Sequence, residues 1–166
     1  MAENTPKVPS RGHKYNILNT FYGLGYWPFS AAIASGFAWL MFWAYVLFFP
    51  NYWYYALIST AVLTAFALVE AYLNRSFVKE DPKQVVFDEF VGMMAIFLIC
   101  PEIDLLVSVG ALVLFRVIDN IKFPPFNYFD NKKAVWAVYA DDIFIGIVLG
   151  LIAKLVMVGL YVRATF

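Results

Sequence analysis

Six acidic residues in three separate parts of the chain are the side chains best suited to chemistry: Asp88, Glu89, Asp119, Asp130, Asp141 and Asp142. Carboxylates are hard oxygen ligands that suit Mg²⁺, an ion that usually keeps several waters and is completed by substrate phosphate. The nearby cations Arg116 and Lys122 could hold such a phosphate, arginine as a planar fork and lysine as a point charge. This combination predicts metal-assisted chemistry on a phosphate.

Other phosphatase mechanisms lack their characteristic residues in this sequence. A histidine nucleophile of the lipid phosphatase type needs paired histidines, and His13 is the single histidine. A cysteine-nucleophile loop needs arginine six positions after the cysteine, but Leu106 stands there after Cys100. No DxDx(T/V) string for an aspartyl-phosphate enzyme occurs. Metal-activated water attacking phosphorus remains, with carboxylates holding the ion and one of them acting as general base.

Acidic residues also have a structural explanation that must be weighed. A carboxylate at a helix start is stabilised by the helix dipole. Taken alone, the pair Asp88-Glu89 or the pair Asp141-Asp142 is therefore explained as well by this stabilisation as by a metal site. Three coincident clusters favour a site, because crowded carboxylates near a membrane boundary repel one another unless a cation neutralises them. The remaining carboxylates considered are expected to be ordinary boundary or loop charges: Glu70, Asp81, Glu102 and Asp104.

The composition indicates an integral membrane protein. Hydrophobic residues make up 63% of the 166 residues and charged residues 14%, whereas soluble domains carry about 25% charged residues. The formal net charge of zero offers no electrostatic case for nucleic acid. A single cysteine excludes an internal disulfide and a cysteine-rich zinc site. No signal peptide is expected, because the first 26 residues lack a short apolar core.

Apolar runs predict an all-α, polytopic membrane helix bundle with about five transmembrane helices. The runs cover residues 27–49, 52–73, 85–100, 103–118 and 143–162. Before them, residues 15–26 show apolar residues at helical spacing and predict a short interfacial helix. Residues 1–14 read as a flexible basic tail, so residues 15–166 form a single membrane-embedded domain.

Basic residues predict the orientation of this bundle. One side collects the N-terminal tail, segment 74–84 and segment 119–142, which together hold nine lysines and arginines, whereas Arg163 is the one basic residue of the other side. The positive-inside rule therefore puts the N-terminus in the cytoplasm. Lys154 falls within the last apolar run, where it is expected to snorkel or face a neighbouring helix.

The same topology brings the candidate site residues to the cytoplasmic face. The first acidic pair lies at the predicted start of the third helix and the second pair at that of the fifth. Arg116 and Asp119 lie at the cytoplasmic end of the fourth helix, and Lys122 and Asp130 in the segment that follows. A lipid phosphate would reach this depth by diffusing within the leaflet.

Three strings carry a family resemblance: VVFDEFVGMM (85–94), FRVIDNIKFPPFNYFD (115–130) and ADDIFIGI (140–147). Their order and spacing resemble the signature blocks of the phosphatidylglycerophosphatase A family. The resemblance implies Mg²⁺-dependent removal of the terminal phosphate from phosphatidylglycerophosphate at the cytoplasmic face of a bacterial inner membrane. By position, six carboxylates match the acidic signature of the family: Asp88, Glu89, Asp119, Asp130, Asp141 and Asp142. Of these, Asp88, Glu89, Asp119 and Asp142 are expected to bind the metal, and Asp130 or Asp141 to act as the general base. Arg116 and Lys122 would bind phosphate.

The sequence departs from the family pattern in its glycine-containing segments. WPFSAAIASG (27–36) stands where the family has a PGTxGS segment, and AVWAVYA (134–140) stands where it often has GGxG. Lost glycines remove close backbone approach to a ligand, so we expect the chemistry to be kept and the departures to affect recognition of the headgroup. One alternative is therefore the same reaction on an inositol phosphate lipid. A second, of a different class, is a small divalent-cation channel or transporter.

Overall fold

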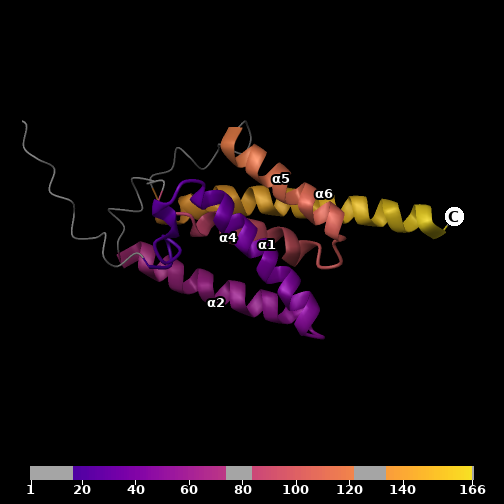
Figure 1. Ribbon diagram of the computed structural model, residues 1–166, viewed down its shortest axis with the longest axis horizontal. Helices are drawn as coiled ribbons and strands as arrows, with labels where there is room; N and C mark the ends of the chain where they lie inside the picture. Colours follow the sequence, from indigo (N-terminus) through magenta and orange to yellow (C-terminus); the bar gives the residue numbers. More distant parts are fainter. Residues whose placement is uncertain (1–16, 74–83, 122–133, 166) are drawn as a thin grey trace, which may run out of the picture.

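The computed structural model describes residues 17–73, 84–121 and 134–165. These residues form five α-helices and one short 3-10 helix, with no strand among them: η2 (Leu24–Tyr26), α1 (Ser30–Phe48), α2 (Tyr52–Leu73), α4 (Phe87–Ile99), α5 (Leu105–Ile121) and α6 (Val135–Thr165) (Figure 1). The all-α class is therefore confirmed. The expected basic tail, Lys122 and Asp130 lie outside the described residues.

Three of the helices, α1, α2 and α6, are long and apolar enough to cross a membrane. The other two are shorter, with 13 residues in α4 and 17 in α5. At 1.5 Å per residue they measure about 20 and 26 Å, less than the ~30 Å of a hydrocarbon core. Every residue from Phe87 to Met94 is buried, and α4 packs against α1, α2 and α6. The bundle is thus built around a short central helix.

Glycines let α4 and α6 approach closely. A Cβ placed on Gly146 of α6 would lie 2.1 Å from the carbonyl oxygen of Gly92 in α4, and one on Gly150 would lie 2.9 Å from Cβ of Ile99. In lipid, such small residues spaced four apart favour helix association because they allow backbones to touch. The backbone contact therefore fixes the position of α4 along α6.

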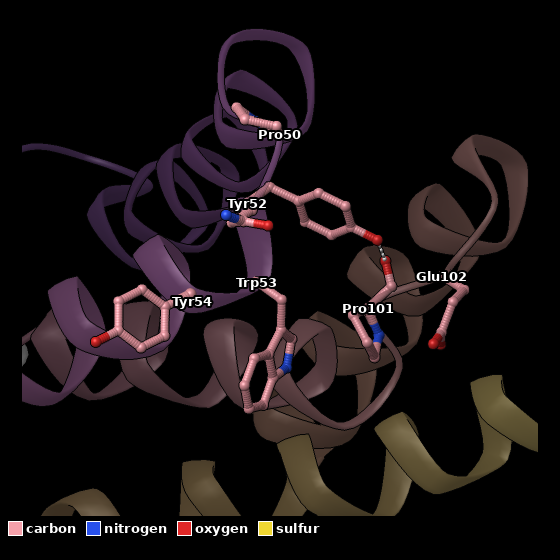
Figure 2. A pocket seen from close by; sticks show the side chains of 7 residues that line it. Pro50, Tyr52, Trp53, Tyr54, Pro101 and Glu102 are labelled. Carbon is pink, nitrogen blue, oxygen red and sulfur yellow. Dashed lines mark hydrogen bonds between the residues drawn. The ribbon is translucent and has the colours of Figure 1, made fainter.

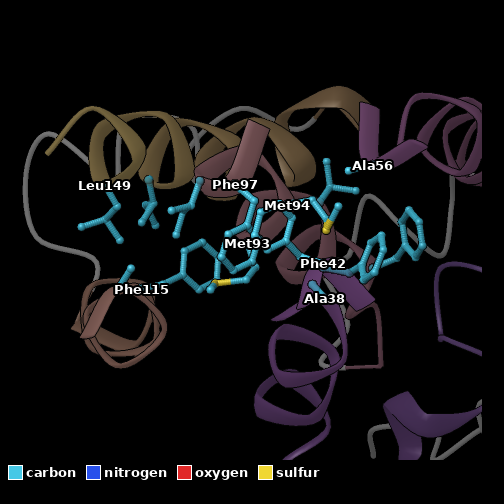
Figure 3. Packing of buried hydrophobic residues seen from close by; sticks show 14 of the residues in the cluster. Ala38, Phe42, Ala56, Met93, Met94, Phe97, Phe115 and Leu149 are labelled. Atoms are coloured by element: carbon cyan, nitrogen blue, oxygen red, sulfur yellow. The ribbon is translucent and has the colours of Figure 1, made fainter. Parts of the chain in front are cut away.

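Aromatic and aliphatic side chains fill the space between the helices. The rings of Phe42 in α1 and Phe97 in α4 are stacked, with their centroids 4.2 Å apart. Met93 of α4, Phe115 of α5 and Leu149 of α6 belong to the same buried cluster (Figure 3). All five α-helices contribute to this core, so it joins segments from both ends of the sequence.

The segment before α1 is not the regular interfacial helix expected for residues 15–26. Residues 17–23 form turns, and η2 follows as a single 3-10 turn. Phe21, Tyr22 and Gly23 have positive φ angles of 50°, 57° and 89°, and such left-handed residues cannot continue a right-handed helix. A Cβ on Gly25 would lie 2.0 Å from the carbonyl oxygen of Gln84. Asn19, Thr20 and Gly25 are therefore buried against the bundle. Other side chains of the segment stay exposed: Ile17, Tyr22 and Tyr26.

The last helix begins earlier than the apolar run suggested. Helix α6 runs without interruption for 31 residues from Val135, so the prediction that Asp141 and Asp142 open a helix is wrong. They lie about 10 Å from its start, at 1.5 Å per residue, and its first turn holds no acidic residue. Since the dipole effect fades within the first turn, it does not account for this buried pair.

Lys154 lies near the level of the loop between α4 and α5. The backbone N–H of Asp104 in that loop contacts the sulfur of Met157, one turn after Lys154, at 3.4 Å. Glu102 of the same loop and Lys154 both act electrostatically on Cys100. Lys154 is exposed, so it is not buried against a neighbouring helix, and its expected snorkelling stays a prediction. Helix α6 continues past this loop toward the C-terminus (Figure 1).

Candidate active site

Three carboxylates from two helices converge at one end of the bundle. Asp88 and Glu89 lie in the first turn of α4, and Asp142 lies in α6. One carboxylate oxygen from each of these three residues lies within 4.8 Å of the other two. Gly92 follows Asp88 by one turn, and Gly146 follows Asp142 by one turn. The glycine contact between α4 and α6 therefore holds the ligands of one helix against that of the other.

Burial makes this cluster costly without a counter-charge. The three residues are 8%, 9% and 3% exposed, and the Oε2 atom of Glu89 is buried with no hydrogen-bond partner among the described residues. Buried carboxylates that face one another are strongly disfavoured unless a cation neutralises them. An all-oxygen donor set suits Mg²⁺, so these residues fit the metal that the sequence predicts.

Asp141 lies beside the cluster but does not belong to the three converging carboxylates. It is 6% exposed, and its Oδ1 accepts a hydrogen bond of 3.1 Å from the backbone N–H of Asp142. It also acts electrostatically on Asp88. Its predicted role as general base is compatible with this position and stays a prediction.

Arg116 and Asp119 form an ion pair on α5. Their atoms Nη1 and Oδ2 are 3.0 Å apart, and the side chains are 18% and 13% exposed. Arg116 also donates a hydrogen bond of 3.5 Å to the hydroxyl of Ser35. Both charges act on Glu89, so the pair borders the carboxylate cluster. Asp119 stands with Arg116, outside the three-carboxylate group, and its role as a metal ligand stays a prediction.

Sequence reasoning missed a polar cluster beside the acidic residues. Glu70 accepts hydrogen bonds from the backbone N–H of Ile17 at 2.6 Å and from that of Asn19 at 2.8 Å. The hydroxyl of Tyr139 donates to the side-chain oxygen of Asn19. The view of Glu70 as an ordinary boundary charge is therefore wrong. The one local signal was a carboxylate inside an apolar run, which in a membrane protein suggests a partner.

A separate pocket lies at the opposite end of α4. Figure 2 shows its lining, in which the aromatic side chains of Tyr52 and Trp53 lie near Pro101 and Glu102. The hydroxyl of Tyr52 donates to the carbonyl of Pro101 at 3.2 Å. Aromatic side chains favour the membrane interface, and the lining contains no basic residue. This pocket marks the far boundary and has no groups for phosphate chemistry.

Comparison with known proteins connects this geometry to a family. The sequence model described as phosphatidylglycerophosphatase A matches residues 17–157, which include all described site residues. The chain belongs to the phosphatidylglycerophosphatase A family. It is therefore a phosphatase acting on phosphomonoester lipids. This membership favours the enzyme over the channel or transporter alternative.

Two curated relatives are similar to this chain over most of its length. Over 139 residues the chain is 27% identical to "Phosphatidylglycerophosphatase A" of Escherichia coli (strain K12), covering 81% of this chain and 78% of the relative. It is 30% identical over 139 residues to a "Putative phosphatidylinositol-3-phosphatase" of Bacteroides thetaiotaomicron, covering 79% of this chain and 86% of the relative. No solved structure matches the phosphatase.

Proposed function

We propose that this protein is a Mg²⁺-dependent phosphomonoesterase that converts phosphatidylglycerophosphate to phosphatidylglycerol at the cytoplasmic face of a bacterial inner membrane. The observation that carries the proposal is the convergence of Asp88, Glu89 and Asp142 in a buried all-oxygen cluster bordered by Arg116. Family membership supports the phospholipid substrate. The excess of basic residues on the site's side of the membrane supports the cytoplasmic orientation.

Each site residue has a role in this reaction. Asp88, Glu89 and Asp142 would hold the metal, with Asp119 as a further ligand directly or through water. When bound, Mg²⁺ supplies charge stabilisation at the phosphoryl oxygens and lowers the pKa of a bound water. Arg116 orients the phosphate, and its ion pair with Asp119 holds the guanidinium before substrate arrives.

The proton and the leaving group complete the scheme. Asp141 or Asp130 takes a proton from the attacking water as its oxygen bonds to phosphorus. The bond between phosphorus and the glycerol oxygen breaks, and that oxygen receives the proton that the carboxylate took from the water, so the carboxylate is regenerated. Lys122, placed by sequence in the segment after α5, would bind the phosphate together with Arg116. The products are inorganic phosphate and phosphatidylglycerol.

An inositol phosphate lipid is the second candidate substrate. The Bacteroides relative carries a phosphatidylinositol-3-phosphatase description at 30% identity, and the glycine-containing segments of the family are replaced in this chain. Because Asp88, Glu89 and Asp142 themselves lie outside those segments, the same chemistry would act on the other headgroup.

Phosphate release from a panel of lipids tests both candidates. Purified protein in detergent should release phosphate from phosphatidylglycerophosphate with Mg²⁺, faster than from phosphatidylinositol 3-phosphate or phosphatidic acid. EDTA should remove the activity and excess Mg²⁺ should restore it. Activity that persists in EDTA would contradict the metal mechanism, and faster turnover of the inositol lipid would assign the headgroup to the second candidate.

Replacing Arg116 by lysine tests the phosphate contact. Lysine keeps the charge but loses the planar fork, and a hydrogen bond to a charged group contributes about 1.5–3 kcal/mol. We therefore expect kcat/KM for the lipid to fall roughly 10- to 100-fold. Arg163→Lys, at an exposed position near the C-terminus, is the matched control and should keep wild-type kinetics. Equal kinetics of the two variants would remove Arg116 from the phosphate site.

A further inference from the structure

Asn19 is the centre of a buried hydrogen-bond network. It is 0% exposed, and its side-chain amide donates to the carbonyl of Ala67 at 3.1 Å and to Oε2 of Glu70 at 2.7 Å. Its side-chain oxygen accepts from the hydroxyl of Tyr139. Its own carbonyl accepts from the backbone N–H of Val86 at 2.9 Å. One residue thus joins the N-terminal segment to α2, α6 and the start of α4.

On both α4 and α6, the network ends within three residues of a proposed metal ligand. Val86 is the N-cap of α4 and lacks a side-chain capping bond, so the start of this helix is held by the carbonyl of Asn19. Asp88 follows Val86 by two positions. On α6, Tyr139 precedes Asp142 by three positions, which puts both on one face of the helix. Asn19 therefore connects the turn that carries two ligands to the helix that carries the third.

We propose that Asn19, Glu70 and Tyr139 are positioning residues that set the spacing of the carboxylate cluster and thereby its affinity for a divalent cation. The inference rests on the proposed metal role of the cluster. A binding site must hold its groups within about 0.5 Å of the productive geometry. Outer partners of metal ligands typically contribute 10- to 100-fold to metal affinity or activity. The glycine contact holds the two helices one turn after Asp88 and Asp142, and this network holds them on the other side of the ligands, at Val86 and Tyr139.

A purely structural role would have a different signature. If the network served only to fasten the N-terminal segment, its loss would lower thermal stability and leave metal affinity unchanged. A positioning role predicts weaker metal binding in folded protein. It also predicts that excess Mg²⁺ restores kcat, because the chemical groups themselves are all present.

Binding of Mn²⁺ without substrate separates these roles. Mn²⁺ accepts the same oxygen ligands as Mg²⁺ and can be followed by electron paramagnetic resonance on the full-length protein in detergent. We expect Tyr139→Phe to raise the Kd for Mn²⁺ about 10-fold. The matched control is Tyr52→Phe, which removes the same hydroxyl from a hydrogen bond to Pro101 at the opposite end of the bundle and should leave the Kd unchanged.

A second variant keeps the test decisive if Tyr139→Phe does not fold. Glu70→Gln keeps the shape of the side chain but puts an amide donor where backbone and side-chain N–H groups now point at a carboxylate, and it should weaken Mn²⁺ binding in the same direction. Wild-type affinity in both folded variants would overturn the positioning role. The proposed metal function itself is tested by comparing the wild-type protein with Asp88→Asn. It would be overturned if the wild-type protein bound no Mn²⁺, or if Asp88→Asn bound Mn²⁺ as tightly as wild type does.

Discussion

Replacing Asp88 by asparagine should nearly abolish phosphate release from the lipid substrate. Asp88 is one of three buried carboxylates whose oxygens lie within 4.8 Å of one another. Loss of an outer partner of a metal ligand already costs roughly 10- to 100-fold, so loss of a ligand should lower kcat/KM by more than about 100-fold. Initial rates over a Mg²⁺ titration, with folding checked by thermal unfolding in detergent, provide the measurement.

In contrast to its activity, the thermal midpoint of the metal-free Asp88→Asn variant should not fall below that of wild type. Asparagine has nearly the same shape as aspartate and removes one of the mutually repelling buried charges, so Asp88→Asn should be at least as stable as wild type without Mg²⁺. Asp104→Asn is the matched control at the opposite end of the bundle, where the amide oxygen can still accept from the N–H of Leu106. Wild-type turnover by Asp88→Asn would show that this residue is not a metal ligand.

Replacing Gly146 by alanine should disrupt the contact between α4 and α6. The added Cβ would lie 2.1 Å from the carbonyl oxygen of Gly92, a distance that forces the two backbones apart. Overpacking of this kind costs about 1–3 kcal/mol, which corresponds to a fall in thermal midpoint of about 3–10 °C for a chain of this size. We also expect kcat/KM to fall by more than the loss of folded protein explains. The reason is that the helices separate one turn from Asp142, which moves this carboxylate away from Asp88 and Glu89.

Gly159 provides a control on the same helix. A Cβ at Gly159 meets nothing within 4 Å, and alanine has a higher helix propensity than glycine by about 1 kcal/mol. Gly159→Ala should therefore retain activity and a thermal midpoint equal to or slightly above that of wild type. If Gly146→Ala behaved like Gly159→Ala, the close packing of α4 on α6 would not be what positions the carboxylates.

Residue types and local spacing predicted much of this protein from the sequence. Composition identified a membrane protein, because few soluble folds are so poor in charge, and the long apolar runs predicted its helices. Short-range patterns located the boundaries of α2 at residues 52–73, since Pro50 and Asn51 form a turn before it. Asp88 and Glu89 open α4 as expected. The three acidic strings also carried the family resemblance, which the comparison confirmed.

Tertiary structure alone decided which of these side chains meet. Local spacing describes one helix at a time, whereas the pairing of Asp142 with Asp88 and Glu89 depends on the backbone contact of Gly92 with Gly146. Residues 134–140 contain no glycine or proline to delay the helix start, so α6 begins at Val135. The burial of Asp141 and Asp142 comes from the packing of α6 against the other helices, mainly α4. The role of Glu70 depends on Asn19, 51 positions away. Such long-range polar contacts leave no periodic pattern, so the folded chain had to reveal them.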